Sequence, residues 1–176
     1  MNNQRGDTLI EVLLATVVIS IVIAAAFTLT NRASRGNQAA IERTTVANLM
    51  RQQVELVRGI RTSGYGIAGG SWEEIITNHT QPATPNYLVW DVPTDAGKSF
   101  FIDPNAADLQ SSGIVMNYPN PGPNDDAYPN DLFRIWVEAY QRNATDDYVD
   151  IHVRAYWDGI GDQGTQRESL ILRLQK

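Results

Sequence analysis

The amino-acid sequence predicts an α+β protein in which a long N-terminal helix packs on a C-terminal antiparallel β-sheet. Three observations support this fold class. An uncharged, mostly apolar run extends from Val12 to Asn31. An amphipathic pattern, with apolar residues three and four positions apart, continues to about residue 62. Runs with a period of two then fill the C-terminal third, and a change from helical spacing to a period of two is typical of a helix followed by strands.

Composition excludes several classes of function. The chain has 176 residues, which suits one modest domain plus an anchor, and a net charge of -6. An acidic protein is a poor non-specific binder of nucleic acid, because phosphate contacts need clustered lysine and arginine. The sparse basic cluster of Arg51, Arg58 and Arg61 is interpreted as a solvated helix face. The absence of cysteine excludes disulfides, thiolate metal sites and a cysteine nucleophile.

The apolar run is long enough to cross a membrane. Twenty residues in a helix span about 30 Å, the thickness of a bilayer core. Its apolar residues surround the helix rather than forming a stripe, so it is expected to lie in lipid or against other helices. Hydroxyl groups within it are expected to bond to the helix backbone, at Thr8, Thr16, Ser20, Thr28 and Thr30.

Two ordinary explanations of this run compete. In a cleaved secretory signal, Arg5 would form the basic region, Leu13–Ile23 the apolar region, and Ala24–Ala26 the cleavage site. Glu11 counts against a secretory signal, because an acid between the basic and apolar regions weakens that pattern. A plain single-pass anchor explains the length of the run but explains neither Gly6 nor Glu11.

A third explanation rests on the segment Gly6-Asp7-Thr8-Leu9-Ile10-Glu11-Val12. This segment resembles the class III signal of type IV pilins and type II secretion pseudopilins. In that family a short basic leader ends in glycine, and a prepilin peptidase cuts after it on the cytoplasmic face. The resemblance places the cut between Gly6 and Asp7, which makes Glu11 the fifth mature residue. The first mature residue of the family is usually an N-methylated phenylalanine, whereas this chain has Asp7.

The resemblance implies a structural, non-catalytic subunit of a type IV pilus filament, either a pilin or a minor pilin. It implies other pilin subunits, the prepilin peptidase, an inner-membrane assembly platform and, before assembly, membrane lipid as partners, with no specific nucleic acid. The subunit would start as a single-pass protein of the inner membrane with a cytoplasmic N-terminus, then enter an extracellular or periplasmic filament. The alternatives are a minor pseudopilin of a type II secretion or competence system and a membrane-tethered binding module that never polymerises.

Glu11 is the candidate assembly residue. A carboxylate near hydrocarbon costs several kcal/mol unless it is paired, and cleavage after Gly6 would create a positive α-amino group on Asp7. In the family, this glutamate is thought to meet the amino terminus of a neighbouring subunit. The alternative is a solvated first-turn acid at the level of the lipid headgroups. The Asp7 carboxylate would compete with Glu11 for the amine.

The four expected segments are a leader (1–6), a membrane and filament-core half of the helix (7–31), an amphipathic half (32–62) and a globular domain (63–176). Since the first proline is Pro82, the helix can continue until Ser63-Gly64 ends it. The amphipathic half has one apolar stripe, formed by Val46, Leu49, Met50, Val54, Val57 and Ile60, and polar cover from Asn48, Gln52 and Gln53.

In the globular domain, a short helix is expected at Trp72–Thr77, a hairpin from Tyr87–Val92 and Lys98–Ile102, and a short strand at Ile114–Asn117. Three longer strands follow, around Phe133–Tyr140, Val149–Trp157 and Leu170–Leu174. Their alternation predicts an antiparallel meander with one buried face. The amphipathic half of the helix is expected to cover that face.

No catalytic, cofactor or metal site is expected. The chain has neither a nucleophile elbow nor a phosphate loop nor a paired-histidine metal motif. Of the two histidines, His79 and His152, the second falls on the outer side of a strand and is expected to be solvated. The acidic loop Asn120–Asp131 is interpreted as a surface loop rather than a calcium site, because its ligand spacing is irregular; Asp146, Asp147, Asp158 and Asp162 are interpreted in the same way.

Overall fold

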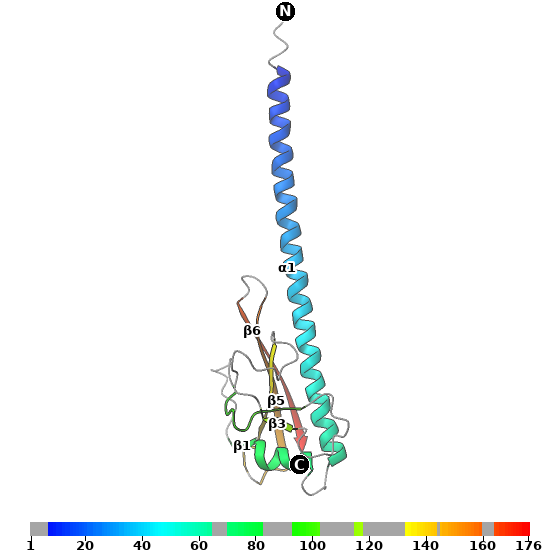
Figure 1. The fold of residues 1–176 in the computed structure, drawn as a ribbon, viewed down its shortest axis with the longest axis vertical. Helices are drawn as coiled ribbons and strands as arrows, with labels where there is room; N and C mark the ends of the chain where they lie inside the picture. The colour runs from blue at the N-terminus through cyan, green and yellow to red at the C-terminus, as the bar shows by residue number, and fades with distance from the viewer. Residues whose placement is uncertain are drawn as a thin grey trace, which may run out of the picture. The chain divides into compact units, whose positions relative to one another are not determined.

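The computed structural model describes residues 7–64, 70–82, 93–102, 115–117, 133–143, 145–159 and 164–176. Helix α1 spans Asp7–Gly64 and is followed by α2 (Ser71–Glu74) and the π-helical turn η1 (Ile75–His79) (Figure 1). The strands are β1 (Thr80–Gln81), β2 (Phe100–Ile102), β3 (Val115–Asn117), β4 (Phe133–Tyr140), β5 (Tyr148–Asp158) and β6 (Thr165–Gln175). The chain divides into two compact units, Met1–Ile41 and Glu42–Lys176.

Helix α1 runs for 58 residues and ends at Gly64, as the sequence predicts. Its last turn carries Arg61, and a cation there is favourable because the C-terminal carbonyl groups carry partial negative charge. The Arg61 Nε also donates a hydrogen bond of 3.0 Å to the backbone carbonyl of Gln175 on β6. The boundary between the units follows Ile41, ten residues after the uncharged run ends at Asn31.

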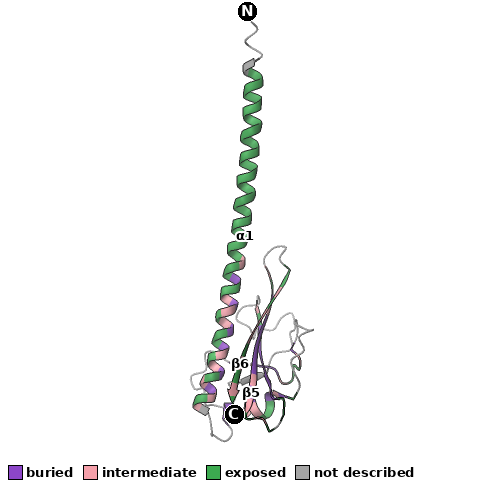
Figure 2. Cartoon of the chain, turned by 180° about the vertical axis from the view of Figure 1, so that it is seen from behind, coloured by how far each residue is buried: buried purple, intermediate pink, exposed green. Residues whose placement is uncertain are grey.

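From residue 42 onward, α1 covers one face of the sheet. The predicted apolar stripe is confirmed: Val46, Met50, Val57 and Ile60 are fully buried, and Leu49 and Val54 pack partly buried against the same core. Figure 2 shows burial beginning along this part of α1. The core beneath it consists of alternate residues of β4 and β5, namely Ile135, Val137, Ala139, Val149, Ile151, Val153, Ala155 and Trp157. The fold is therefore α+β, as expected, because the helix and the strands share one hydrophobic core.

Gln53 corrects the sequence prediction, which placed it among the polar cover. It occupies the same stripe as Met50 and Val57, and only 2% of it is exposed. Its side-chain amide makes two hydrogen bonds with Ile102 of β2, donating through Nε2 to the carbonyl and accepting from the backbone N–H, each 3.0 Å long. A buried amide is costly unless it is paired, and the two bonds to one residue satisfy it.

The described strands form one sheet in the order β3-β2-β4-β5-β6, with β1 pairing in parallel with β4. The other pairs are antiparallel. The meander of β4, β5 and β6 is confirmed, and β6 begins at Thr165, five residues earlier than Leu170, where the expected strand starts. Gly164 precedes it with φ +64, a left-handed conformation that glycine adopts without strain.

The shorter elements agree with their predictions where the structure describes them. The helix expected at Trp72–Thr77 corresponds to α2 and η1, and Trp72 and Ile75 belong to the core. The short strand expected at Ile114–Asn117 is β3. The second strand of the expected hairpin contains β2, while Tyr87–Val92 lies outside the described residues.

Candidate functional site

The candidate processing segment lies at the start of α1. Gly6 precedes the described residues, and Asp7 is the first residue of the helix. Glu11 lies in the second turn and is exposed. Four of the expected hydroxyl bonds to the backbone are confirmed, from Thr16, Ser20, Thr28 and Thr30 to carbonyl groups three or four residues earlier, at 2.7 to 2.9 Å. These bonds remove free hydroxyl donors from a helix that has apolar side chains all around it.

The apolar surface of this part of the helix is uncovered within the unit of residues 1–41. Every large apolar side chain from Leu9 to Leu29 has between 51% and 68% of its surface exposed. Each such side chain gains about 1.5–3 kcal/mol when it is fully removed from water. By length and composition, one described helix, Leu9–Ser63, qualifies as a candidate membrane span. The unit therefore presents an apolar rod that lipid or other helices can cover.

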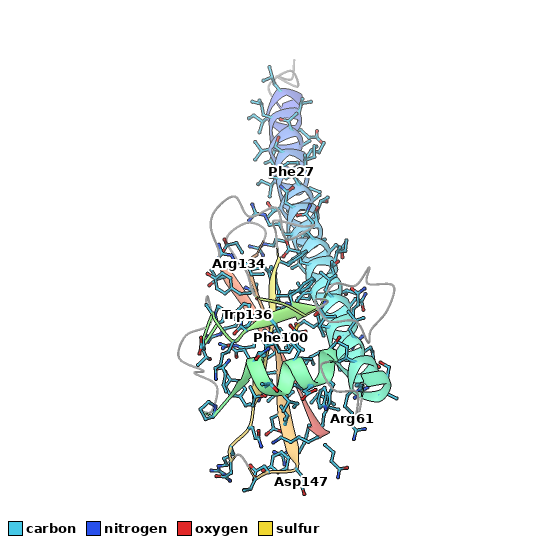
Figure 3. The ribbon with its side chains drawn as sticks, turned by 60° about the horizontal axis from the view of Figure 1, so that its bottom comes forward. Phe27, Arg61, Phe100, Arg134, Trp136 and Asp147 are labelled. Atoms are coloured by element: carbon cyan, nitrogen blue, oxygen red, sulfur yellow. The ribbon has the colours of Figure 1, made fainter. Side chains whose placement is uncertain are left out.

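The sheet has a second buried face, which the sequence analysis did not anticipate. Along β4, the six residues from Ile135 to Tyr140 are buried without a break, so both faces are covered there. The prediction of one buried face is therefore wrong for β4 and for much of β5. The face opposite α1 carries Trp136, Glu138 and Tyr140 on β4, with Trp136 near the middle of the sheet (Figure 3).

An ion pair between Glu138 and Arg154 forms the centre of this second face. Both side chains are fully buried, and Arg154 Nη1 lies 3.2 Å from Glu138 Oε2. The same carboxylate accepts hydrogen bonds from the Thr94 backbone N–H at 2.7 Å and from the Tyr140 hydroxyl at 2.9 Å. The Arg154 guanidinium stacks 5.4 Å from the Trp136 ring. Several donors on one carboxylate offset the cost of taking the charge out of water.

His152 belongs to the same cluster, so its expected solvation is wrong. It is only 5% exposed, and its ring meets that of Tyr140 edge to face at 5.1 Å. Burial lowers the pKa of His152, while the nearby carboxylates of Glu138 and Asp150 act in the opposite direction. Burial also raises the pKa of Tyr140 well above its ordinary value, so its hydroxyl stays protonated and donates to Glu138.

His79 is the second buried histidine. Its Nδ1 lies 3.1 Å from the Lys98 carbonyl, and its ring lies 5.0 Å from that of Phe100. Burial lowers the pKa of His79, and this effect outweighs the hydrogen bond to Lys98 and the Glu74 carboxylate, which both raise it. Both histidines are therefore held neutral at neutral pH.

Acidification should destabilise the unit of residues 42–176 because of these two histidines. In the unfolded chain each ring takes up a proton near pH 6.5, whereas the folded pKa values are lower. The stabilisation is therefore complete above pH 6.5 and is lost as the pH falls below it, by up to about 1.4 kcal/mol per pH unit for each histidine. Denaturant unfolding followed by tryptophan fluorescence, at pH values on either side of 6.5, measures the loss.

The double variant His79→Gln/His152→Gln serves as the control for this prediction. It should unfold with nearly the same midpoint at both pH values, even if it is less stable overall. An undiminished pH dependence in that variant would show that other groups cause it. The Asp150 carboxyl does not confound the comparison, because the Arg173 guanidinium holds its pKa below its ordinary value, so it titrates at lower pH.

Sequence reasoning missed the buried cluster because alternation along a strand reveals two faces but does not reveal what covers either one. One signal was present. The face opposite α1 carries Trp136, Tyr140 and Tyr156 besides its charged residues, and large aromatic side chains on a supposedly solvated face indicate cover. Thr94, far away in sequence, supplies part of it through its bond to Glu138.

A metal centre finds no support in the residues that the structure describes. Among them, no group of three or more histidine, cysteine, aspartate or glutamate side chains gathers closely enough to hold a metal ion. Asp146 instead accepts hydrogen bonds from the backbone and side chain of Asn143, which closes the turn between β4 and β5. The acidic loop Asn120–Asp131 lies outside the described residues.

Comparison with known families identifies the N-terminal segment. A family model described as the prokaryotic N-terminal methylation motif matches residues 1–27. The motif includes Gly6, Asp7, Glu11 and the first part of the apolar run, and it marks a structural class of protein rather than an enzymatic one. Comparisons with curated proteins and with solved structures gave no match.

Proposed function

We propose that this chain, which carries the class III signal peptide typical of type IV pilins and pseudopilins, is a structural subunit of a type IV pilus, either a pilin or a minor pilin. The observation that supports this proposal is the position of the motif, at the start of an unbroken helix whose first part exposes large apolar side chains from Leu9 to Leu29. A protein of this kind needs no catalytic centre, because its activity is assembly.

Membrane insertion is the first step of the proposed pathway. The apolar part of α1 would hold the precursor in the inner membrane as a single-pass protein with a cytoplasmic N-terminus. A prepilin peptidase on that side would then cut between Gly6 and Asp7 and leave a positive α-amino group on Asp7. The assembly platform would transfer the mature subunit from lipid into the filament.

Charge pairing directs the second step, in which the mature helix leaves lipid for the filament core. In lipid and in a filament core the apolar side chains of α1 are equally shielded from water, so apolar burial alone does not set the position of one subunit against the next. The Glu11 carboxylate can set it, because an unpaired charge in such surroundings costs several kcal/mol. Pairing of Glu11 with the amino terminus of a neighbouring subunit removes that cost at one axial stagger.

The mature N-terminus tests the proposal directly. Intact-mass and N-terminal peptide mass spectrometry of the protein, purified from membranes of its natural host, should identify Asp7 as the first residue. A first residue of Met1 would indicate a plain anchor, and a first residue near Phe27 would indicate a secretory signal; either would contradict the proposal. The same spectrum shows whether the α-amino group of Asp7 is methylated.

Fractionation then separates the two kinds of filament that share the motif. Recovery of mature chain in sheared extracellular filaments supports a pilus, and its abundance there distinguishes a major from a minor pilin. Recovery only in the cell envelope, with loss of a secreted or imported substrate on deletion, would instead assign the chain to a pseudopilus.

A further inference from the structure

A polar groove of about 540 Å³ lies within the unit of residues 42–176. One wall is the face of α1 that carries Arg43 and Arg51, and the other is formed by Trp157 of β5 with Gln166, Arg167 and Glu168 of β6. Helix and strand run side by side here (Figure 2), and Arg43 Nη2 donates a 3.3 Å hydrogen bond across to Gln166 Oε1. The volume falls in the range of ordinary ligand sites.

The charge of this groove is opposite to that of the chain. Three arginines and one glutamate line it, whereas the chain as a whole has a net charge of -6. Three other arginines of the unit face carboxylates: Arg58 faces Glu55, Arg154 faces Glu138 and Arg173 faces Asp150. Arg43, by contrast, donates its hydrogen bond within the described residues to the neutral amide of Gln166. A cluster of cations in a concave site attracts negative charge.

The spacing of the two helix arginines indicates the shape of a ligand. Arg43 and Arg51 are eight residues apart on one face of α1, which places their Cα atoms about 12 Å apart along the helix. Alternate side chains of an extended peptide point the same way, so residues four apart on one face are separated by about 13 Å. Two carboxylates at that spacing can each meet one arginine.

We propose that this groove binds an extended, acidic peptide segment of a partner protein through Arg43 and Arg51. The groove is also lined by Asn48, whose side-chain amide suits the backbone carbonyl and N–H groups of a peptide. Glu168 would repel a continuous run of phosphates, and the negative chain disfavours nucleic acid generally. No groove residue belongs to the N-terminal motif, so this binding stands apart from assembly through the helix.

Fluorescence anisotropy with a labelled peptide tests the proposal on the full chain in detergent micelles. The probe is a short, otherwise neutral peptide with two glutamates four positions apart, and its control carries glutamines instead. Arg43→Gln and Arg51→Gln should each weaken binding of the acidic peptide by about two- to fivefold, as expected for exposed charge pairs. The double variant should weaken it by about tenfold, and added salt should weaken the wild-type complex.

Arg58→Gln provides the matched control, because Arg58 is an exposed arginine of the same helix that pairs with Glu55 and does not line the groove. This variant should bind the peptide as the wild type does. Three results would overturn the proposal: equal binding by the double variant, equal binding of the glutamine peptide, or tighter binding of a single-stranded oligonucleotide of matched charge. Self-association of the wild type that the double variant loses would instead assign the groove to a second copy of the chain.

Discussion

Replacement of Glu138 by alanine is expected to destabilise the unit of residues 42–176 by about 3–5 kcal/mol, the cost of leaving one member of a buried ion pair without its partner. The variant would leave the buried Arg154 guanidinium without its ion-pair partner. It would also remove the acceptor for the Thr94 N–H and the Tyr140 hydroxyl. A loss of this size is a large fraction of the stability of a typical domain. Denaturant unfolding in detergent, followed by tryptophan fluorescence, measures it.

A double-mutant cycle shows whether the loss comes from the pair itself. Arg154→Met alone should destabilise the unit to a similar degree, because it leaves the buried Glu138 carboxylate without its cationic partner. The double variant Glu138→Ala/Arg154→Met removes both charges, so its loss should be far smaller than the sum of the single losses. Simple addition of the two losses would contradict the coupling that the buried geometry predicts.

The Asp150–Arg173 pair supplies the matched control on the same face of the sheet. Its contact is shorter, 2.7 Å against 3.2 Å, but 63% of the Arg173 side chain is exposed. Water screens an exposed pair and replaces its hydrogen bonds when one partner is removed. Arg173→Gln should therefore cause a much smaller loss than Arg154→Met, despite the shorter distance.

Replacement of Glu11 by alanine is expected to abolish incorporation into filaments while leaving the leader cleaved. The proposed interface would then bury the amino terminus of a neighbouring subunit without its anion, which costs several kcal/mol and so reduces incorporation by several orders of magnitude. Cleavage should persist, because the cut lies between Gly6 and Asp7. Glu11 belongs neither to the leader nor to the scissile bond. Immunoblots of sheared filaments and of membranes, with mass spectrometry of the N-terminus, measure both steps.

Glu55→Ala provides the control for this prediction, since Glu55 is an exposed acid of the same helix that contacts Arg58 rather than a neighbouring subunit in the proposal. This variant should enter filaments normally. Normal filaments from Glu11→Ala would contradict the assembly role of Glu11 and favour a solvated acid at the headgroup level. An uncleaved Glu11→Ala precursor would instead show that Glu11 acts at processing.

The features that follow from local patterns were predictable. The motif around Gly6 and Glu11 is a short contiguous signal, and the family comparison independently matches residues 1–27. The end of α1 at Gly64 follows from a glycine after a long proline-free stretch. The three long strands follow from a period of two, and the apolar stripe of α1 from spacings of three and four. Each depends on residues that are close together in the chain.

The features that depend on distant residues were not predictable. From the sequence alone, Gln53 is interpreted as polar cover. In the structure, its side-chain amide makes both of its hydrogen bonds with the backbone of Ile102, which is 49 residues away. The parallel pairing of β1 with β4 joins segments about 60 residues apart, and no periodicity encodes such a partner. The groove likewise combines α1 with the β6 strand, whose residues are more than 100 positions later.

The sequence by itself determined the membrane-length helix, its processing motif and the alternation of the late strands, because helical and strand periods are properties of neighbouring residues. Only the tertiary structure decided that Glu138, Arg154 and His152 are buried. A period of two assigns these residues to the face opposite α1 but carries no information about what packs there, and it is burial that turns ordinary surface residues into a coupled ion pair and a neutral histidine.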